Sequence, residues 1–269
     1  MRTNHRTMTT AGALALVAAM AISIAGCDDL GGGETITGSG TLETRSYDFE
    51  DFSELDLGSA FDVEVTQGDS YAVEVTVDDN IVDDLDVKRD GKTVRIAMKG
   101  PDGYRNVTQE ARVTMPALSR SKLSGATSAT FGGFASDDRL EVELAGASSV
   151  VCSDMAAGSV KFDLAGASSV KCSDVVTGDT TVALAGASNL ELTGSGADAD
   201  VKAEGASSVL MGDFPVEAAV VKLTGASNAT VNASGTLDVD LAGSSDLTYL
   251  GEPRLGETKV AGDSTLERG

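Results

Sequence analysis

The sequence is short of the residues on which many active sites depend. It contains no tryptophan and a single histidine, His5, and aromatic residues make up only 4% of the chain. A mechanism that uses a histidine base, a Ser–His or Cys–His pair, or a histidine-ligated metal would therefore have to use His5. Cysteine is also rare, with three residues, so each one can be considered individually.

The amino terminus has the pattern of a secretory signal peptide. Basic residues precede an uncharged run from Ala11 to Gly26, which is too short to span a bilayer comfortably and is followed by Cys27. The segment Ile24-Ala-Gly-Cys27 resembles a bacterial lipobox, which implies cleavage after Gly26 and acylation of Cys27. We therefore expect a signal peptide over residues 1–26 and a membrane anchor on Cys27. The alternatives are an ordinary signal peptide or an uncleaved anchor with a chance cysteine.

Cleavage at that point would change the chemistry that remains. It would remove the only histidine and two arginines, leaving 18 basic and 42 acidic residues and a formal net charge of −24. Such a surface repels nucleic acid and anionic lipid headgroups. We expect no nucleic-acid partner, no cofactor and no chemistry that depends on histidine.

A glycine-rich segment follows Cys27. Glycine clusters at residues 31–33 and 38–40 are typical of a flexible linker. We expect residues 27–40 to contain the lipidated cysteine and a flexible tether, and residues 41–269 to form a single domain.

An internal repeat with a period near 20 residues occupies residues 121–269. Its recurring motif is Leu-x-Gly-Ala-Ser-Ser-Val, as in residues 144–150 and 164–170. The central glycines are separated by 18 to 21 residues, and they are Gly125, Gly146, Gly166, Gly186, Gly205, Gly225, Gly243 and Gly262. Repetition at a fixed period is typical of solenoid architectures.

Aligned copies of the repeat show which positions face inward. The positions two before, four after and six after the glycine are apolar in nearly every copy, whereas Lys161 and Asp163 alternate with apolar neighbours. This period of two indicates strands, which bury one continuous core when the copies stack. We predict an all-β parallel β-helix (β-solenoid) of about 20 residues per coil, with glycine at each corner. A serine two residues after the glycine is expected to form a hydroxyl ladder from coil to coil.

The segment before the clear repeats is also rich in strands but less regular. Alternating segments are separated by turns at residues 67–69 and 90–92, and no convincing helix follows the signal peptide. The expected strands lie at residues 61–65, 71–75, 87–88, 94–96 and 111–113.

The order of these motifs carries a family resemblance. The series begins at residues 52–55, continues through residues 58–65, Gly68, 73–75, 85–87, Gly91 and 94–96, and then reaches the Leu-x-Gly-Ala-Ser repeats. It resembles the putative auto-transporter adhesin, head GIN domain family, over about residues 45–266. The resemblance implies a right-handed β-helix displayed outside the cytoplasm, with adhesion as the proposed role. The sequence after Gly262 shows neither a trimeric coiled coil nor a barrel segment, so we expect anchoring through Cys27.

Two classes of function fit this pattern. The first is a non-catalytic envelope module that binds a glycan, a partner protein or a second copy of itself through a long solenoid face. The second is a polysaccharide-active lyase or hydrolase, because parallel β-helices also host such enzymes and fold alone does not choose. We favour the module, because the regular coils lack a basic cluster or an aromatic platform for an acidic sugar. We expect no catalytic residues.

Paired aspartates raise the question of a metal site. They occur at residues 78–79, 83–84 and 137–138, but neither an EF-hand nor a nine-residue calcium repeat is present. A solvated acidic face is the better interpretation, and we expect no metal.

Two further cysteines are separated by one period. Cys152 and Cys172 occupy the same inward position in neighbouring copies, so their Cα atoms should lie about 4.8 Å apart. That spacing fits either a disulfide or two buried thiols that fill the core.

Overall fold

The computed structural model describes residues 35–100 and 103–269. The predicted signal peptide, Cys27 and most of the predicted tether lie outside the described residues. Within them no helix is long and apolar enough to cross a membrane.

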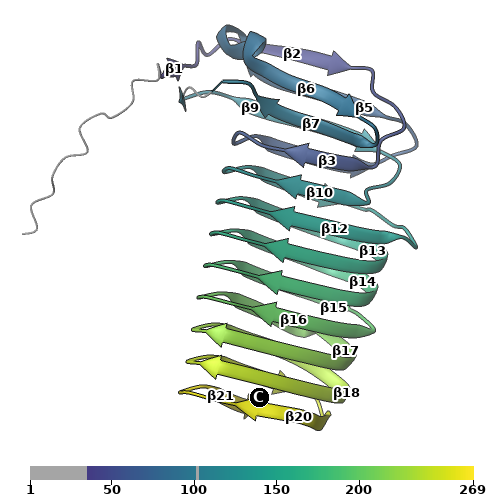
Figure 1. Ribbon diagram of the computed structural model, residues 1–269. Helices are drawn as coiled ribbons and strands as arrows, with labels where there is room; N and C mark the ends of the chain where they lie inside the picture. Colours follow the sequence, from purple (N-terminus) through teal and green to yellow (C-terminus); the bar gives the residue numbers. More distant parts are fainter. Residues whose placement is uncertain (1–34, 101–102) are drawn as a thin grey trace, which may run out of the picture. The chain divides into compact units, whose positions relative to one another are not determined.

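The repeats stack as parallel coils, as the sequence predicts (Figure 1). The leucine column two residues before each glycine runs in register from coil to coil, with Leu144 beside Leu164 and Leu164 beside Leu184. Some coils consist of one long bent strand and others of two shorter strands. The strands of this part are β10 (Arg120–Leu123), β11 (Ser128–Gly132), β12 (Arg139–Leu144), β13 (Ser149–Leu164), β14 (Ser169–Leu184), β15 (Asn189–Ser195), β16 (Asp198–Ala203), β17 (Ser208–Gly225), β18 (Asn228–Gly243), β19 (Asp246–Leu250), β20 (Arg254–Val260) and β21 (Thr265–Arg268).

The glycine of each repeat forms one corner of its coil. Gly166 has a φ of 86°, a conformation that L-residues with a side chain rarely adopt. A Cβ atom there would also collide with the carbonyl oxygen of Gly146 in the neighbouring coil. The glycine column is therefore required both by backbone conformation and by the close approach of successive coils.

The serine column beside the glycines is buried, but its hydrogen bonds differ from the expected ladder. The Ser148 hydroxyl donates to the carbonyl of Ala145 at 3.0 Å, and the Ser168 hydroxyl donates to that of Ala165 at 2.9 Å. These bonds close the corner within one coil. The coils are joined there mainly by backbone bonds, such as Ala167 N to Gly146 O at 2.8 Å, and in later coils the hydroxyls of Ser207 and Ser227 also lie 3.4 Å from a glycine carbonyl of the preceding coil.

In three successive coils, the bend opposite the glycine corner is also formed by a residue with a positive φ. Asp154 and Asp174 bend β13 and β14 in the left-handed region, with φ values of 54° and 55°. Aspartate tolerates this conformation better than most residues with a Cβ. In the next coil Gly194, with a φ of 129°, lies at the corresponding bend.

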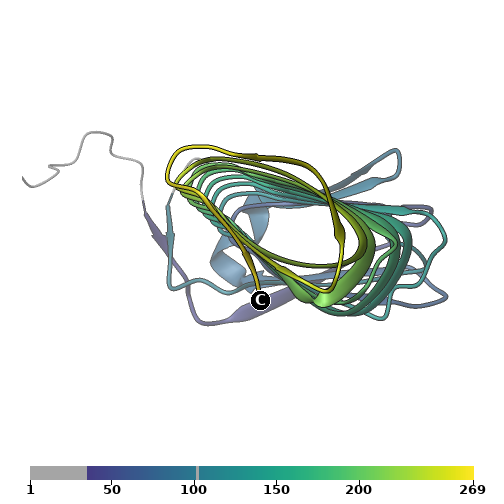
Figure 2. The same cartoon turned by 90° about the horizontal axis from the view of Figure 1, so that it is seen from below.

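The inward side chains fill the interior of the coils, which follow one another as a flattened ring (Figure 2). They form one continuous core in which Val150, Phe162 and Leu164 are each 1% exposed. The last copy departs from this pattern, because Val260 is 45% exposed and no described coil lies beneath β20.

The amino-terminal region forms a mixed arrangement of strands at one end of the stack. β3 lies between β10 and β7, and β4 lies between β11 and β9, so the chain leaves the stack after β4 and returns at β10. The expected strands are confirmed, but β2–β5, β5–β9 and β6–β7 pair antiparallel, which the sequence did not predict. The elements are β1 (Ile36–Thr37), β2 (Leu42–Tyr47), β3 (Glu54–Leu57), β4 (Asp62–Gln67), β5 (Ala72–Asp78), the 3₁₀ helix η1 (Asp79–Asp84), β6 (Leu85–Asp90), β7 (Thr93–Met98), β8 (Tyr104–Arg105) and β9 (Gln109–Met115).

The end of the predicted tether is part of this region. β1 pairs with β8, and the Gly40 backbone N–H donates to the Asp78 carboxylate at 2.7 Å. A Cβ on Gly38 would collide with the carbonyl oxygen of Asn106. These glycines, which suggested flexibility in the sequence, instead allow the chain to lie close against the fold.

Candidate functional site

Cys152 and Cys172 lie side by side in the core, as the repeat alignment requires. They are register partners on β13 and β14, their Cα atoms are 4.4 Å apart, and the structure joins them by a disulfide. Their side chains are 5% and 1% exposed. The pair is therefore an internal link between two coils and is not accessible to a ligand.

The paired aspartates do not form a common acidic surface. Asp78 is 1% exposed, and its carboxylate accepts hydrogen bonds from the backbone N–H groups of Thr108 and Gly40. These bonds lower the pKa of Asp78 below its ordinary value of 3.8. Asp78 is therefore a structural residue, and the expectation that it belongs to a solvated face is wrong. Within the described part of the chain, no group of three or more His, Cys, Asp or Glu residues could hold a metal ion.

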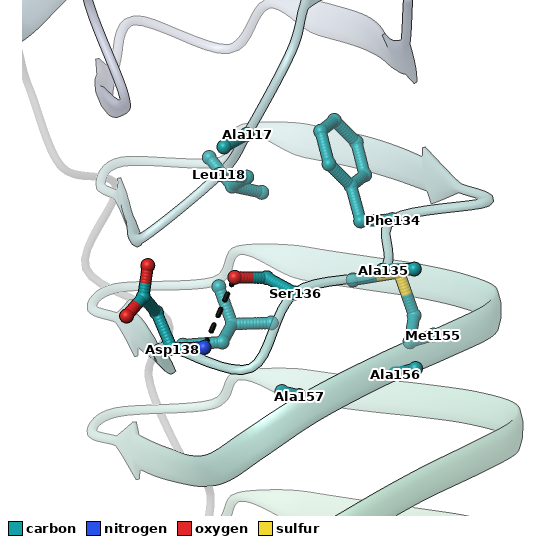
Figure 3. A pocket seen from close by; sticks show the side chains of 10 residues that line it. Ala117, Leu118, Phe134, Ala135, Ser136, Asp138, Met155, Ala156 and Ala157 are labelled. Atoms are coloured by element: carbon teal, nitrogen blue, oxygen red, sulfur yellow. Dashed lines mark hydrogen bonds between the residues drawn. The ribbon is translucent and has the colours of Figure 1, made fainter.

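A small cavity lies beneath the loop between β11 and β12 (Figure 3). It is lined mainly by apolar side chains, among them Leu118, Phe134 and Met155, and Asp138 N donates to the Ser136 hydroxyl beside it. Its volume is about 10 Å³, which is close to the space needed by a single water molecule. The cavity is therefore a packing gap and has no room for a substrate.

One outward face of the solenoid, here called the charged face, carries alternating acids and bases. It is formed by β3, β7, β10, β12, β16, β20 and the second halves of β13, β14, β17 and β18. Its charged residues include Glu54, Asp56, Arg95, Arg120, Lys122, Glu141, Glu143, Lys161, Asp163, Asp200, Lys202, Lys222, Asp238, Asp240, Glu257 and Lys259.

Ion pairs run across the charged face. Lys161 donates to Glu141 at 2.8 Å, and this hydrogen bond lowers the pKa of Glu141 and raises that of Lys161. Arg120 similarly pairs with Glu143 at 2.7 Å. A shallow groove of about 340 Å³ crosses the lower part of this face. Its three lysines are also paired, as Lys202–Asp200, Lys222–Asp240 and Lys259–Glu257.

A second outward face, here called the neutral face, has a different chemistry. It is formed by β11, β15 and the first halves of β13, β14, β17 and β18, and it ends where its outward columns become acidic, at Asp62 and Glu64 on β4 and at Asp246 on β19. Its outward side chains form two columns and are mostly hydroxyls and amides. They are Ser128, Ser149, Ser169, Asn189, Ser208 and Asn228 in one column, and Thr130, Val151, Lys171, Glu191, Leu210 and Thr230 in the other.

The neutral face carries one ion pair and no net charge. Lys171 donates to Glu191 at 2.9 Å, and no other charged residue is among its twelve side chains. Hydrogen bonds link neighbours along the first column, such as Ser208 to Asn228 at 2.7 Å. Val151 and Leu210 stand 51% and 47% exposed. Val220 on the charged face is similarly exposed, at 48%, so the two faces differ in charge and not in the exposure of single aliphatic side chains.

Sequence reasoning missed the neutral face although its signal was present. The same repeat alignment that identified the inward columns also fixes the outward ones, three and five residues after each glycine. Reading those columns for charge would have separated the two faces.

Comparisons with known proteins agree with this fold. Residues 51–253 match the family described as "Putative auto-transporter adhesin, head GIN domain". Among curated proteins, none has a significant sequence match to the chain.

Several solved structures are similar to the chain along most of its length. One from Parabacteroides distasonis, described as a putative lipid binding protein, has a TM-score of 0.81 and 20% identity, covering 88% of this chain and 100% of the other. A putative adhesin from the same species has a TM-score of 0.73 and 18% identity, with coverage of 88% and 100%. A putative adhesin from Bacteroides fragilis has a TM-score of 0.66 and 19% identity, with coverage of 87% and 100%. At these identities the similarity shows the fold alone.

Proposed function

Because the chain belongs to the putative auto-transporter adhesin, head GIN domain family, we propose that it is a non-catalytic envelope lipoprotein that binds its partner through the neutral face. The observation that carries the proposal is the contrast between its two outward faces. Covering the charged face would desolvate many ions, whereas the neutral face contains a single ion pair. The neutral face can therefore be covered at a lower cost in desolvation.

The absence of catalysis is supported by how the repeated serines are used. Ser148, Ser168 and Ser188 are at most 1% exposed, and each hydroxyl donates to a backbone carbonyl at its own corner. A nucleophile must reach its substrate and needs an adjacent base. These serines are therefore structural, and a polysaccharide-active enzyme has no comparable supporting observation.

The location in the envelope rests on the amino-terminal sequence. The proposed signal peptide, residues 1–26, would direct export, and acyl chains on Cys27 would hold the protein at a membrane surface. The names of the structural relatives, adhesin and lipid binding protein, describe those proteins and agree with a binding role outside the cytoplasm.

A matched pair of substitutions tests the choice of face. Leu210 on the neutral face and Val220 on the charged face are 47% and 48% exposed, so neither change to aspartate should disturb the core. Fluorescently labelled protein comprising residues 34–269 would be titrated onto intact cells and onto purified envelope polysaccharide. Leu210→Asp should reduce binding by about tenfold or more, because it introduces a charge into the contact. Equal binding by Leu210→Asp and Val220→Asp would rule out the neutral face.

A further inference from the structure

We propose that the partner of the neutral face is a second copy of this chain, packed face to face about a two-fold axis. This inference rests on the proposed function, because it names the partner of the same surface. Its basis is the order of side chains along the outward column that contains Lys171 and Glu191.

That column is self-complementary about its midpoint. Over the six central coils, backbone register places Thr130, Val151, Lys171, Glu191, Leu210 and Thr230 in this order, and the column continues beyond them to Glu64 on β4 and Thr248 on β19. From the midpoint outward, the paired positions hold a base and an acid (Lys171 and Glu191), then two aliphatic residues (Val151 and Leu210), then two threonines (Thr130 and Thr230). Each residue thus matches the chemistry of the residue at the same distance on the other side of the midpoint.

A two-fold axis would bring the matching positions of two copies opposite one another. If the axis lies in the interface, parallel to the strands and level with the gap between Lys171 and Glu191, each column faces its own copy in reverse. Lys171 then faces the partner's Glu191, Val151 faces the partner's Leu210, and Thr130 faces the partner's Thr230. Each contact occurs twice, as an isologous interface requires.

The neighbouring column fits the same axis. It runs Ser128, Ser149, Ser169, Asn189, Ser208 and Asn228 on the same coils. Reversal places Ser169 opposite Asn189, Ser149 opposite Ser208 and Ser128 opposite Asn228. Hydroxyls and amides can each donate and accept, so each of these six positions faces a group with which it can hydrogen-bond. One coil further out, Asp62 would lie opposite Asp246 of the partner subunit, so the complementary surface is limited to these six coils.

The net negative charge of the two copies favours contact through the neutral face. Two copies with a formal charge of −22 each repel at long range, and the approach is least unfavourable when surfaces without net charge meet. The interface spans about 24 Å along the stack and about 16 Å along the strands, from coil and residue spacings. That plan area, about 400 Å², is below the roughly 800 Å² per partner of a standard stable interface. We therefore expect a dimer that dissociates on dilution.

Charge reversal provides the test. Residues 34–269 contain the whole described core and would be used as a soluble protein, with sedimentation velocity measured over a range of concentrations. Lys171→Glu and Glu191→Lys each place like charges opposite one another twice, so each should weaken self-association by about tenfold or more. Both changes also break the exposed intrachain pair, whose loss should alter stability only slightly. Thermal melting of each variant checks this.

Mixing the two variants separates the effect between chains from the effect within each chain. In the mixed pair, the acid introduced at position 171 of one chain faces the base introduced at position 191 of the other, and the native Glu191 faces the native Lys171. The mixture should therefore associate at least as well as the parent protein, although the intrachain pair remains broken in both molecules. Lys161→Glu, a similar change on the charged face, is the control and should leave association unchanged.

The outcomes distinguish this inference from the function on which it rests. A parent protein that stays monomeric at every concentration, or a mixture that does not associate, overturns the dimer. Loss of association in Lys161→Glu alone would also overturn it, by placing the interface on the charged face. If the dimer is absent but Leu210→Asp still loses binding to cells, the proposed function stands and its partner is another molecule. If neither effect is seen, both proposals fail.

Discussion

Single residues at the corners decide whether successive coils can stack. Gly166 supplies a positive φ and leaves room for the carbonyl of Gly146, and Ser168 satisfies the carbonyl of Ala165. The two residue types act together, because a tight turn leaves carbonyl groups without strand partners. Repetition of glycine with a hydroxyl residue two positions later, Thr127 in the first copy and serine in the others, is thus explained by the structure of the corner.

This requirement predicts a large difference between two glycine-to-alanine changes. Gly166→Ala should lower the melting temperature by at least about 4 °C, because alanine pays a cost of roughly 1–2 kcal/mol in the left-handed region and also collides with the next coil. Gly132→Ala is the control, since a Cβ at Gly132 meets nothing within 4 Å and its φ is not positive. Thermal unfolding followed by circular dichroism would compare them. Equal melting temperatures would contradict the role assigned to the corner.

At the scale of the strand, the sequence predicted the parts that repeat and failed where repetition stops. The column containing Leu144, Leu164 and Leu184 was predicted correctly because each copy repeats the same inward spacing. The antiparallel pairing of β5 with β9 was missed, because alternation shows that a segment is a strand but does not identify its neighbour. Burial of Asp78 was missed because its partners, Gly40 and Thr108, are distant in sequence.

The inward columns should be intolerant of charge. Leu164→Asp would place a carboxylate without a partner among stacked aliphatic side chains, and we expect it to lower the free energy of unfolding by at least about 4 kcal/mol. Val151→Asp lies on the same strand, β13, but Val151 is 51% exposed, so this control should change stability by about 0.5 kcal/mol at most. Urea unfolding of both variants provides the comparison. Similar midpoints for the two would show that the inward assignment is wrong.

The disulfide between Cys152 on β13 and Cys172 on β14 can be tested by peptide mapping. The disulfide closes a loop of 20 residues, and such a cross-link contributes on the order of 3 kcal/mol when it forms. We expect peptide mapping of unreduced protein, exported to an oxidising compartment and alkylated after denaturation, to recover Cys152 and Cys172 in one linked pair. Two alkylated thiols would instead show that the cysteines serve only as core filling.

At the scale of the whole molecule, the two ends of the stack differ. At one end, antiparallel strands and η1, with Ile81 and Val82 buried, cover the first coil. At the other end, Leu255 and Val260 of β20 stand 42% and 45% exposed. The neutral and charged faces lie along the stack between these ends. A binding role would therefore use the sides of the solenoid, where the chemistry differs from face to face.

The proposed anchor would connect the amino-terminal end of the fold to a membrane by a short segment. Eight residues lie between Cys27 and Ile36, the start of β1, so a fully extended chain reaches at most about 30 Å. We expect a fatty-acid probe supplied to cells that produce the full sequence to label the protein, and Cys27→Ser to abolish the label and leave unprocessed precursor. Cys152→Ala is the control, because the Cys152 sulfur is buried in the disulfide with Cys172 and its loss should leave labelling intact. Normal labelling of Cys27→Ser would refute the lipid anchor, and the solenoid would then need another means of attachment to the envelope.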